Sequence, residues 1–127
     1  MSLKTRATTV KEFMFVFRRN PDSEKTFQSP EKMQALWKAW QDWTESLVAQ
    51  NRLAGTGKRL GTDGKVVNPK RLVTNGPYVE LKETVAGYMF VYANTIDEAV
   101  EIAKASPNLT MGGTVEVRPV VSENNTA

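Results

Sequence analysis

Neither cysteine nor histidine occurs among the 127 residues of the chain. Without cysteine, the chain can form no disulfide and offers no thiol nucleophile. Because cysteine and histidine are both absent, the chain lacks the side chains that hold most zinc, copper and iron ions. We therefore expect no metal site and no cofactor. A Ser-His-Asp triad or a Cys-His pair is also excluded. Any acid–base chemistry would therefore depend on Asp, Glu, Lys or Tyr.

Long apolar runs are missing as well. No window of about 18 apolar residues occurs, so the sequence predicts no transmembrane helix and no membrane partner. The first residues lack the apolar stretch of a secretory signal, which together with the absence of cysteine favours a cytoplasmic location. The hydrophobic content of 40% is enough for one core, and the length fits a single domain.

Charge is present in both signs, with a net charge of +3. Basic residues concentrate in the first twenty positions and between Lys58 and Arg71, a region that includes Arg59. Neither region interleaves closely spaced aromatic residues as a base-stacking platform does, so the pattern disfavours nucleic acid as a partner. Two interpretations stay open, namely solvated surface charge and a surface that attracts small anions.

Two short apolar segments, residues 12–18 and 85–94, predict buried strands. Alternation places Val85, Gly87 and Met89 on one face of the second segment, and in both segments the opposite face is also apolar. Further strands are expected at 56–60, 65–67, 70–74 and 114–121. An Asp-Gly turn at 63–64 is expected to join the first two of these, and a sharp turn is expected at 75–77, after the third.

Helix signals flank these strands. Ser29 and Pro30 mark the start of a long helix that is expected to reach about Arg52. Three Trp residues recur at helical spacing along it; they pack in the core, or one of them, Trp40, borders a cavity. Thr95 opens a second helix as a capping box with the Glu three residues later.

This order of elements is typical of the ferredoxin-like βαββαβ fold. It runs from a strand through a long helix, a strand with a hairpin insertion and another strand to a second helix and a last strand. We predict one α+β domain over residues 12–121 with an antiparallel sheet, an N-terminal arm at 1–11 and a C-terminal tail at 122–127. Helices on one side leave the other side of such a sheet bare. Because the best strands are apolar on both faces, we expect a second copy to cover it, sheet against sheet, as a homodimer. The rival cover is the N-terminal arm.

The second half of the chain carries short motifs in a fixed order. They are Thr74 to Glu83, Gly87-Tyr88, Asp97-Glu98-Ala99, Pro107, Gly112-Gly113 and Glu116-Val117-Arg118-Pro119. In this order they resemble the YCII-related proteins, specifically the subgroup named for a DGPF motif, and the resemblance extends over about residues 12–121. It implies a dimeric α+β barrel with a ligand-sized cleft between sheet and helices. Some relatives are linked to extracytoplasmic-function sigma factors, which implies a sensing role.

The chain departs from the family pattern at two points. Asn75 stands where the motif has Asp, and no His is present for the His-Asp pair of other relatives. Asn keeps the hydrogen bonds of a turn but cannot act as a base. A carboxylate base would then be Glu80, Glu83 or Glu116.

Glu116 and Arg118 lie two apart in a predicted strand and therefore share a face. They form either a structural ion pair or an anion site in which Arg118 binds the ligand. The predicted ligand-binding residues are Arg118, Glu116, Asn75, Tyr78, Arg59 and Trp40.

The function predicted first is the binding or sensing of a small anionic or aromatic molecule in the cleft. The alternative is an acid–base isomerase or lyase acting on a small cyclic substrate, with a Glu as base and Tyr78 or Lys82 as acid. That alternative requires a Glu whose pKa is raised by burial. A third hypothesis is a module that binds a protein partner and no small ligand.

Overall fold

The computed structural model describes residues 10–20, 29–61, 63–76 and 84–121. Its strands are β1 (Lys11–Arg19), β2 (Leu53–Gly55), β3 (Gly64–Val67), β4 (Val73–Gly76), β5 (Thr84–Ala93) and β6 (Thr114–Pro119). Its helices are α2 (Pro30–Ala49), α3 (Ile96–Lys104) and α4 (Pro107–Thr110). None of these described helices is long and apolar enough to cross a membrane.

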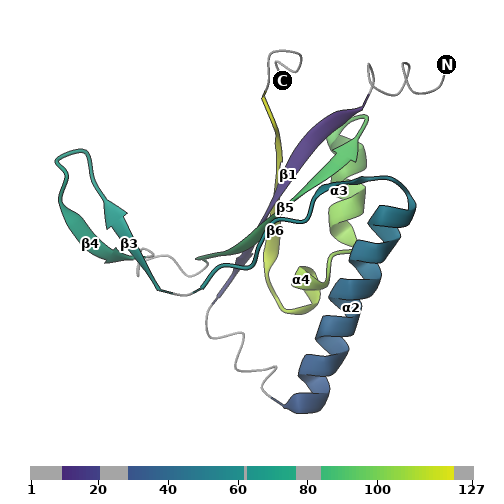
Figure 1. Ribbon diagram of the computed structural model, residues 1–127, viewed down its shortest axis with the longest axis horizontal. Helices are drawn as coiled ribbons and strands as arrows, with labels where there is room; N and C mark the ends of the chain where they lie inside the picture. The colour runs from purple at the N-terminus through teal and green to yellow at the C-terminus, as the bar shows by residue number, and fades with distance from the viewer. Residues whose placement is uncertain (1–9, 21–28, 62, 77–83, 122–127) are drawn as a thin grey trace.

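The main sheet has four strands in the order β2-β5-β1-β6, and each neighbouring pair is antiparallel. This is the strand order of a ferredoxin-like fold in which the β3–β4 hairpin is inserted between the second and third strands. The predicted α+β fold class is therefore confirmed. Figure 1 shows all three helices on one side of the sheet, while the hairpin extends away from the other side.

The core lies between the sheet and α2. Alternate residues of β1 and β5 point toward the helices, and they pack against α2 and α3. Phe15 is 0% exposed, and its ring stacks on Trp43 with the ring centroids 6.3 Å apart. The core cluster comprises Phe13, Phe15, Phe17, Trp43, Leu47, Met89, Val91, Ala93, Ala99 and Ala103.

A β-bulge interrupts the alternation near the start of β5. Phe17 pairs with Gly87, but the next residue of β1, Arg18, pairs with Val85, so Ala86 is the extra residue. Val85 therefore lies on the helix-free face with Arg18, and its predicted place beside Gly87 and Met89 is wrong. The alternation of apolar residues along a sequence does not indicate where a bulge will occur, so the change of face at Val85 could not be predicted from it. Arg19, which continues the inward-facing series of β1, is buried on the helix side.

Helix α2 begins as expected, because the Ser29 hydroxyl accepts a hydrogen bond from the Lys32 amide at 3.2 Å. It ends at Ala49, three residues before the predicted end, where Asn51 adopts a left-handed φ of 60°. The chain then enters β2 directly, since the Arg52 carbonyl accepts from the Tyr92 amide of β5 at 2.6 Å. The strand predicted at 56–60 is thus replaced by β2, and residues 56–61 follow the edge of β5.

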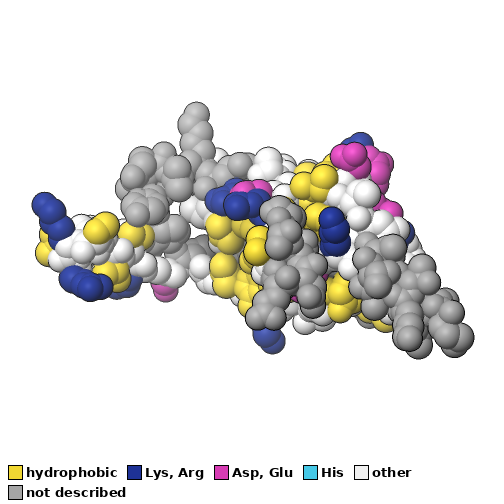
Figure 2. Space-filling model, turned by 90° about the horizontal axis from the view of Figure 1, so that it is seen from above, with side chains coloured by type: hydrophobic (Ala, Val, Ile, Leu, Met, Phe, Trp, Pro, Cys, Tyr) yellow, Lys and Arg dark blue, Asp and Glu magenta, His cyan; other side chains and the backbone are white. Residues whose placement is uncertain are grey.

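The inserted hairpin pairs differently from the prediction. The Asp-Gly signal at 63–64 does not make a turn between paired strands, because β3 starts there and pairs with β4. The actual turn spans 68–72, where the Asn68 side-chain oxygen accepts from the amides of Lys70 and Leu72 at 2.9 and 3.0 Å. Asn75 lies within β4 rather than in a turn, and Pro77 is outside the described residues. The space-filling view shows the hairpin carrying basic and hydrophobic side chains side by side (Figure 2).

Helix α3 has the predicted capping box, in which Thr95 Oγ1 accepts from the Glu98 amide at 3.1 Å. The carboxylate of Glu98 also accepts from Arg52 Nη1 at 2.6 Å and from the Asn94 amide at 3.2 Å. The hydrogen bond from Arg52 is the main reason that the pKa of Glu98 lies below its ordinary value of 4.5. This pair fastens the exit of α2 to the start of α3.

A pH-dependent loss of stability is expected from this pair. Folding lowers the pKa of Glu98. The ionised carboxylate therefore stabilises the fold fully at pH values above its pKa in the unfolded chain, and this stabilisation is lost as the pH falls through its pKa in the folded chain. Glu98→Gln should lower the free energy of unfolding at pH 7 by on the order of 1 kcal/mol. Urea unfolding at about pH 7 and about pH 3 checks this. If Glu98→Gln lowered the free energy of unfolding by the same amount at both pH values, the ion pair between Glu98 and Arg52 would not be the cause.

Candidate functional site

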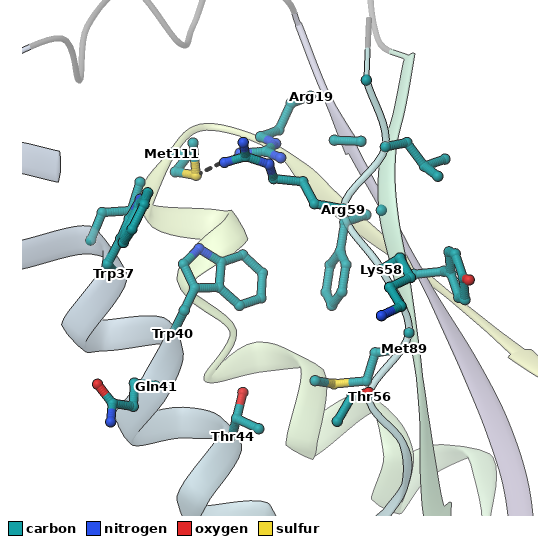
Figure 3. Close-up of a pocket in the computed structure, with 18 of the residues that line it drawn as sticks. Arg19, Trp37, Trp40, Gln41, Thr44, Thr56, Lys58, Arg59, Met89 and Met111 are labelled. Carbon is teal, nitrogen blue, oxygen red and sulfur yellow. Dashed lines mark hydrogen bonds between the residues drawn. The ribbon is translucent and has the colours of Figure 1, made fainter. Parts of the chain in front are cut away.

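A cleft of about 1230 Å³ lies between α2 and the strip formed by residues 56–61 and β5 (Figure 3). Known small-molecule sites measure about 300–1,000 Å³, so the space is ample for a ligand. Its described lining comprises Phe17, Arg19, Met33, Leu36, Trp37, Trp40, Gln41, Thr44, Thr56, Gly57, Lys58, Arg59, Leu60, Gly61, Ala86, Gly87, Tyr88, Met89 and Met111. The cleft therefore lies on the helix side of the sheet, where the family resemblance implies one.

The α2 wall of the cleft is aromatic. Trp40 packs edge-to-face on Phe17 and on Trp43, with ring centroids 5.2 and 5.7 Å apart. These contacts with the core fix the ring, and in Figure 3 it points into the space between α2 and β5. Trp37, one turn earlier, is 61% exposed. Gln41 and Thr44 add an amide and a hydroxyl to the same wall.

The opposite wall depends on a close approach between two backbone segments. The Leu60 amide donates to the Ala86 carbonyl at 2.8 Å, and the Tyr88 amide donates to the Lys58 carbonyl at 3.2 Å. Gly57 makes this approach feasible, because it has a φ of 66° and a Cβ there would overlap the Tyr88 carbonyl oxygen. The strip held in this way carries Lys58 and Arg59.

The charge of the described lining has one sign. Arg19, Lys58 and Arg59 all border the cleft, and no carboxylate is found among its described lining residues. Arg19 is 9% exposed, and its Nη1 lies 3.0 Å from the sulfur of Met111. In Figure 3 the Arg59 side chain reaches toward the same end of the cleft. This concentration of positive charge between apolar walls suits a negatively charged group.

The predicted ligand-binding residues fall in different places. Trp40 and Arg59 line the cleft together. Asn75 lies in the projecting hairpin, where its side-chain oxygen accepts from Lys65 Nζ at 2.6 Å. Tyr78 lies outside the described residues, as do Lys82 and the candidate bases Glu80 and Glu83.

Glu116 and Arg118 lie on the helix-free face of the sheet, while their neighbours in β6 pack against the core. Glu116 bridges two cations, with Arg18 Nη2 at 3.0 Å and Arg118 Nη1 at 3.2 Å. The hydrogen bond from Arg18, followed by that from Arg118, lowers the pKa of the Glu116 carboxyl. The described contacts thus make this group an ion-pair partner on the face opposite the cleft.

The cleft lining also includes residues that the sequence did not single out as ligand-binding, among them Arg19, Trp37, Lys58 and Met111. Arg19 carried a usable signal, because it continues the odd-numbered series of Phe13, Phe15 and Phe17 and must face the same side. Lys58 shared the signal of Arg59, because both lie in the basic region from Lys58 to Arg71. Met111 carried none, because it lies in a connecting segment whose position depends on the sheet that it borders.

Comparison with known proteins assigns the chain to a family. A model of the YCII-related domain matches residues 12–124, which is most of the chain. A search of curated proteins found no match. The match includes the sheet, the helices and the cleft between them, and it agrees with the resemblance carried by the motifs between Thr74 and Pro119. The chain therefore belongs to the YCII-related family.

Proposed function

We propose that the protein binds a small anionic or aromatic molecule in the cleft between α2 and β5, as a binding or sensing module. The observation that carries this proposal is the combination of a rigid Trp40 wall with the positive charges of Arg19, Lys58 and Arg59. An apolar cleft with a few convergent polar groups is the usual form of a small-molecule site. The cleft also leaves room for a ligand, since its volume is about 1230 Å³.

Thermal unfolding in the presence of a broad panel of small anions and aromatic compounds tests this proposal. Compounds that bind the folded chain should raise its melting temperature in a saturable way. Arg59→Ala should weaken that binding about tenfold, because a hydrogen bond to a charged group is lost. Arg118→Ala is the matched control on the opposite face and should change it little. A panel without any stabilising compound, or equal losses in the two variants, would speak against the cleft.

The enzyme alternative gains no support from the described part of the chain. It requires a carboxylate whose pKa is raised, whereas the pKa of Glu116, the one candidate base within that part, is lowered by Arg18. A lowered pKa makes a carboxylate a weaker base. An acid–base role for Glu80 or Glu83 stays a prediction from the sequence, as does a ligand role for Asn75 and Tyr78.

We also propose that the helix-free face of the sheet pairs with a second copy of the chain. Apolar side chains occupy the middle of this face, with Val16 opposite Tyr88 and Met14 opposite Phe90 across the β1–β5 pair. The rings of Tyr88 and Phe90 meet edge-to-face, with centroids 6.0 Å apart. An apolar surface of this kind on a sheet is suited to burial against another sheet.

Val16→Lys is expected to convert the dimer into single chains. Val16 lies opposite Glu116 in the β1–β6 pair, so the introduced ammonium has an acidic neighbour in the monomer but would be buried in the dimer. Sedimentation at micromolar concentration should show two chains for the wild type and one for the variant. A wild type that sediments as one chain would refute the dimer. A cytoplasmic location and a link to a sigma factor stay predictions from the sequence.

A further inference from the structure

The β3–β4 hairpin exposes an apolar surface. From residue 65 to residue 75 every side chain is exposed except that of Val66, which is half-buried. Val67 and Val73 lie directly opposite each other, so they share one face of the hairpin, and they are 62% and 60% exposed. A hairpin of two strands is only marginally stable in water by itself. Covering the valine pair would therefore stabilise it.

The direction of the hairpin indicates what can cover it. Figure 1 shows it projecting from the helix-free side of the sheet, which is the side on which a second sheet would stack. Packed sheets lie about 10 Å apart, and the four residues of β3 extend about 13 Å. A second copy seated on the helix-free face would therefore lie beside the hairpin and within its reach.

The main sheet offers little area for a dimer by itself. Its strands β1, β5, β2 and β6 have 9, 10, 3 and 6 residues. A residue in a sheet covers about 3.4 by 4.8 Å, so the footprint of this sheet is roughly 450 Å². Each partner in a standard interface buries about 800 Å² of accessible surface. Contacts outside the sheet would thus strengthen the pair, and the hairpins are placed to supply them.

Charge favours the same partner. The charged side chains of residues 64–76 are Lys65, Lys70 and Arg71, which are all basic. Glu12 lies on the helix-free face, since it alternates with the buried Phe13, and its carboxylate makes no ion pair within the described part of the chain. A basic hairpin from a second copy would offer it a cation.

We infer that the hairpin of each copy packs the face with Val67 and Val73 against the other copy. This inference rests on the proposed pairing of the helix-free faces, and it adds an exchanged contact to that pairing. Each chain would then contribute to the dimer twice, once through its sheet and once through its hairpin.

The absence of cysteine from the chain allows a direct test. Val67→Cys introduces one thiol, and the rate at which a maleimide alkylates it reports whether the hairpin is covered. The rate should be at least about tenfold lower in the dimer than in single chains that also carry Val16→Lys, because a covered thiol reacts only when the contact opens. Lys38→Cys, at an exposed position of α2, is the control and should react equally fast in both backgrounds.

The outcomes separate the hairpin contact from the dimer itself. Equal rates for Val67→Cys in the two backgrounds, in a chain that sediments as a dimer, would overturn the hairpin contact and leave the paired sheets. A wild type that sediments as one chain would overturn both. A thiol that stays reactive in the dimer but is protected on phosphatidylglycerol vesicles would overturn the contact and assign the hairpin to an anionic membrane surface.

A second pair of variants locates the face that makes the contact. Val73→Asp should weaken association of the dimer at least about tenfold, because it would bury a charge. Thr74→Asp introduces the same charge into the same strand on the opposite face of the hairpin, so it should change the association little. Equal weakening by the two variants would overturn the assignment of the contact to the face with Val67 and Val73.

Discussion

Replacing Gly57 with alanine is expected to destabilise the fold by about 3 kcal/mol or more. The φ of 66° at this position already costs a residue with a Cβ about 1–2 kcal/mol. The new Cβ would also overlap the carbonyl oxygen of Tyr88, in a strand that is anchored in the core by Met89, Val91 and Ala93. Relief of the overlap would stretch the hydrogen bond from the Tyr88 amide to the Lys58 carbonyl, at a further cost of about 1 kcal/mol.

Two other glycines provide controls of graded severity. Gly112 has a φ of 82° but open space where a Cβ would lie, so Gly112→Ala should cost the conformational part alone, about 1–2 kcal/mol. Gly61 has neither constraint, and Gly61→Ala should change stability by less than about 0.5 kcal/mol. Urea unfolding of the three variants gives this ranking. If Gly57→Ala and Gly112→Ala lost equal stability, the close approach of the two segments would be refuted.

Asn108→Ala is expected to cost about 2–4 kcal/mol. Asn108 is 0% exposed, and its side-chain amide donates to the carbonyls of Thr114 and Arg18 at 2.8 and 3.3 Å. It thereby ties the end of β1 to the start of β6. Alanine would leave these carbonyls without that donor and would leave a void in a buried position. Since the Arg18 carbonyl is bonded to the nitrogen of Arg19, ligand binding in the cleft should weaken as well.

Asn108→Asp separates the hydrogen bonds from the packing. The introduced carboxylate has nearly the size of the amide but places an acceptor where a donor faced two carbonyls. At neutral pH it should be at least as damaging as Asn108→Ala. The introduced group will have its pKa raised by folding, so this penalty develops as pH rises above about 3.9 and is relieved in acid, where the protonated group donates again. Urea unfolding of both variants at two pH values checks this, and a difference between them that does not vary with pH would contradict it.

Most of the fold was accessible from the sequence, because the strongest signals are local and repetitive. The apolar runs of β1 and β5, the caps at Ser29 and Thr95 and the order of elements all predicted the architecture. The errors concern pairing. An Asp-Gly dipeptide indicates a chain reversal, but it does not specify which strands are joined, and here β3 pairs forward with β4.

The candidate site was predicted less well, for a physical reason. Trp40 and Arg59 were identified by residue type and region, but their meeting depends on how closely residues 56–61 approach β5. That approach is set by Gly57 and by the bulge at Ala86, neither of which shows in hydrophobic periodicity. Glu116 and Arg118 were correctly assigned to one face of a strand, yet the alternation alone could not tell that the cleft opens on the other face.

The bulge at Ala86 also determines which wall of the cleft can be re-engineered. The strand wall depends on the close backbone approach of residues 56–61 to β5, which requires the extra residue Ala86 and the glycines Gly57 and Gly87, so altering that backbone would disturb the sheet. The helix wall is built from side chains, and Trp37 and Gln41 project from a continuous, well-capped α-helix. Selectivity could therefore be diversified by randomising a few positions along α2, with the sheet kept as a constant scaffold.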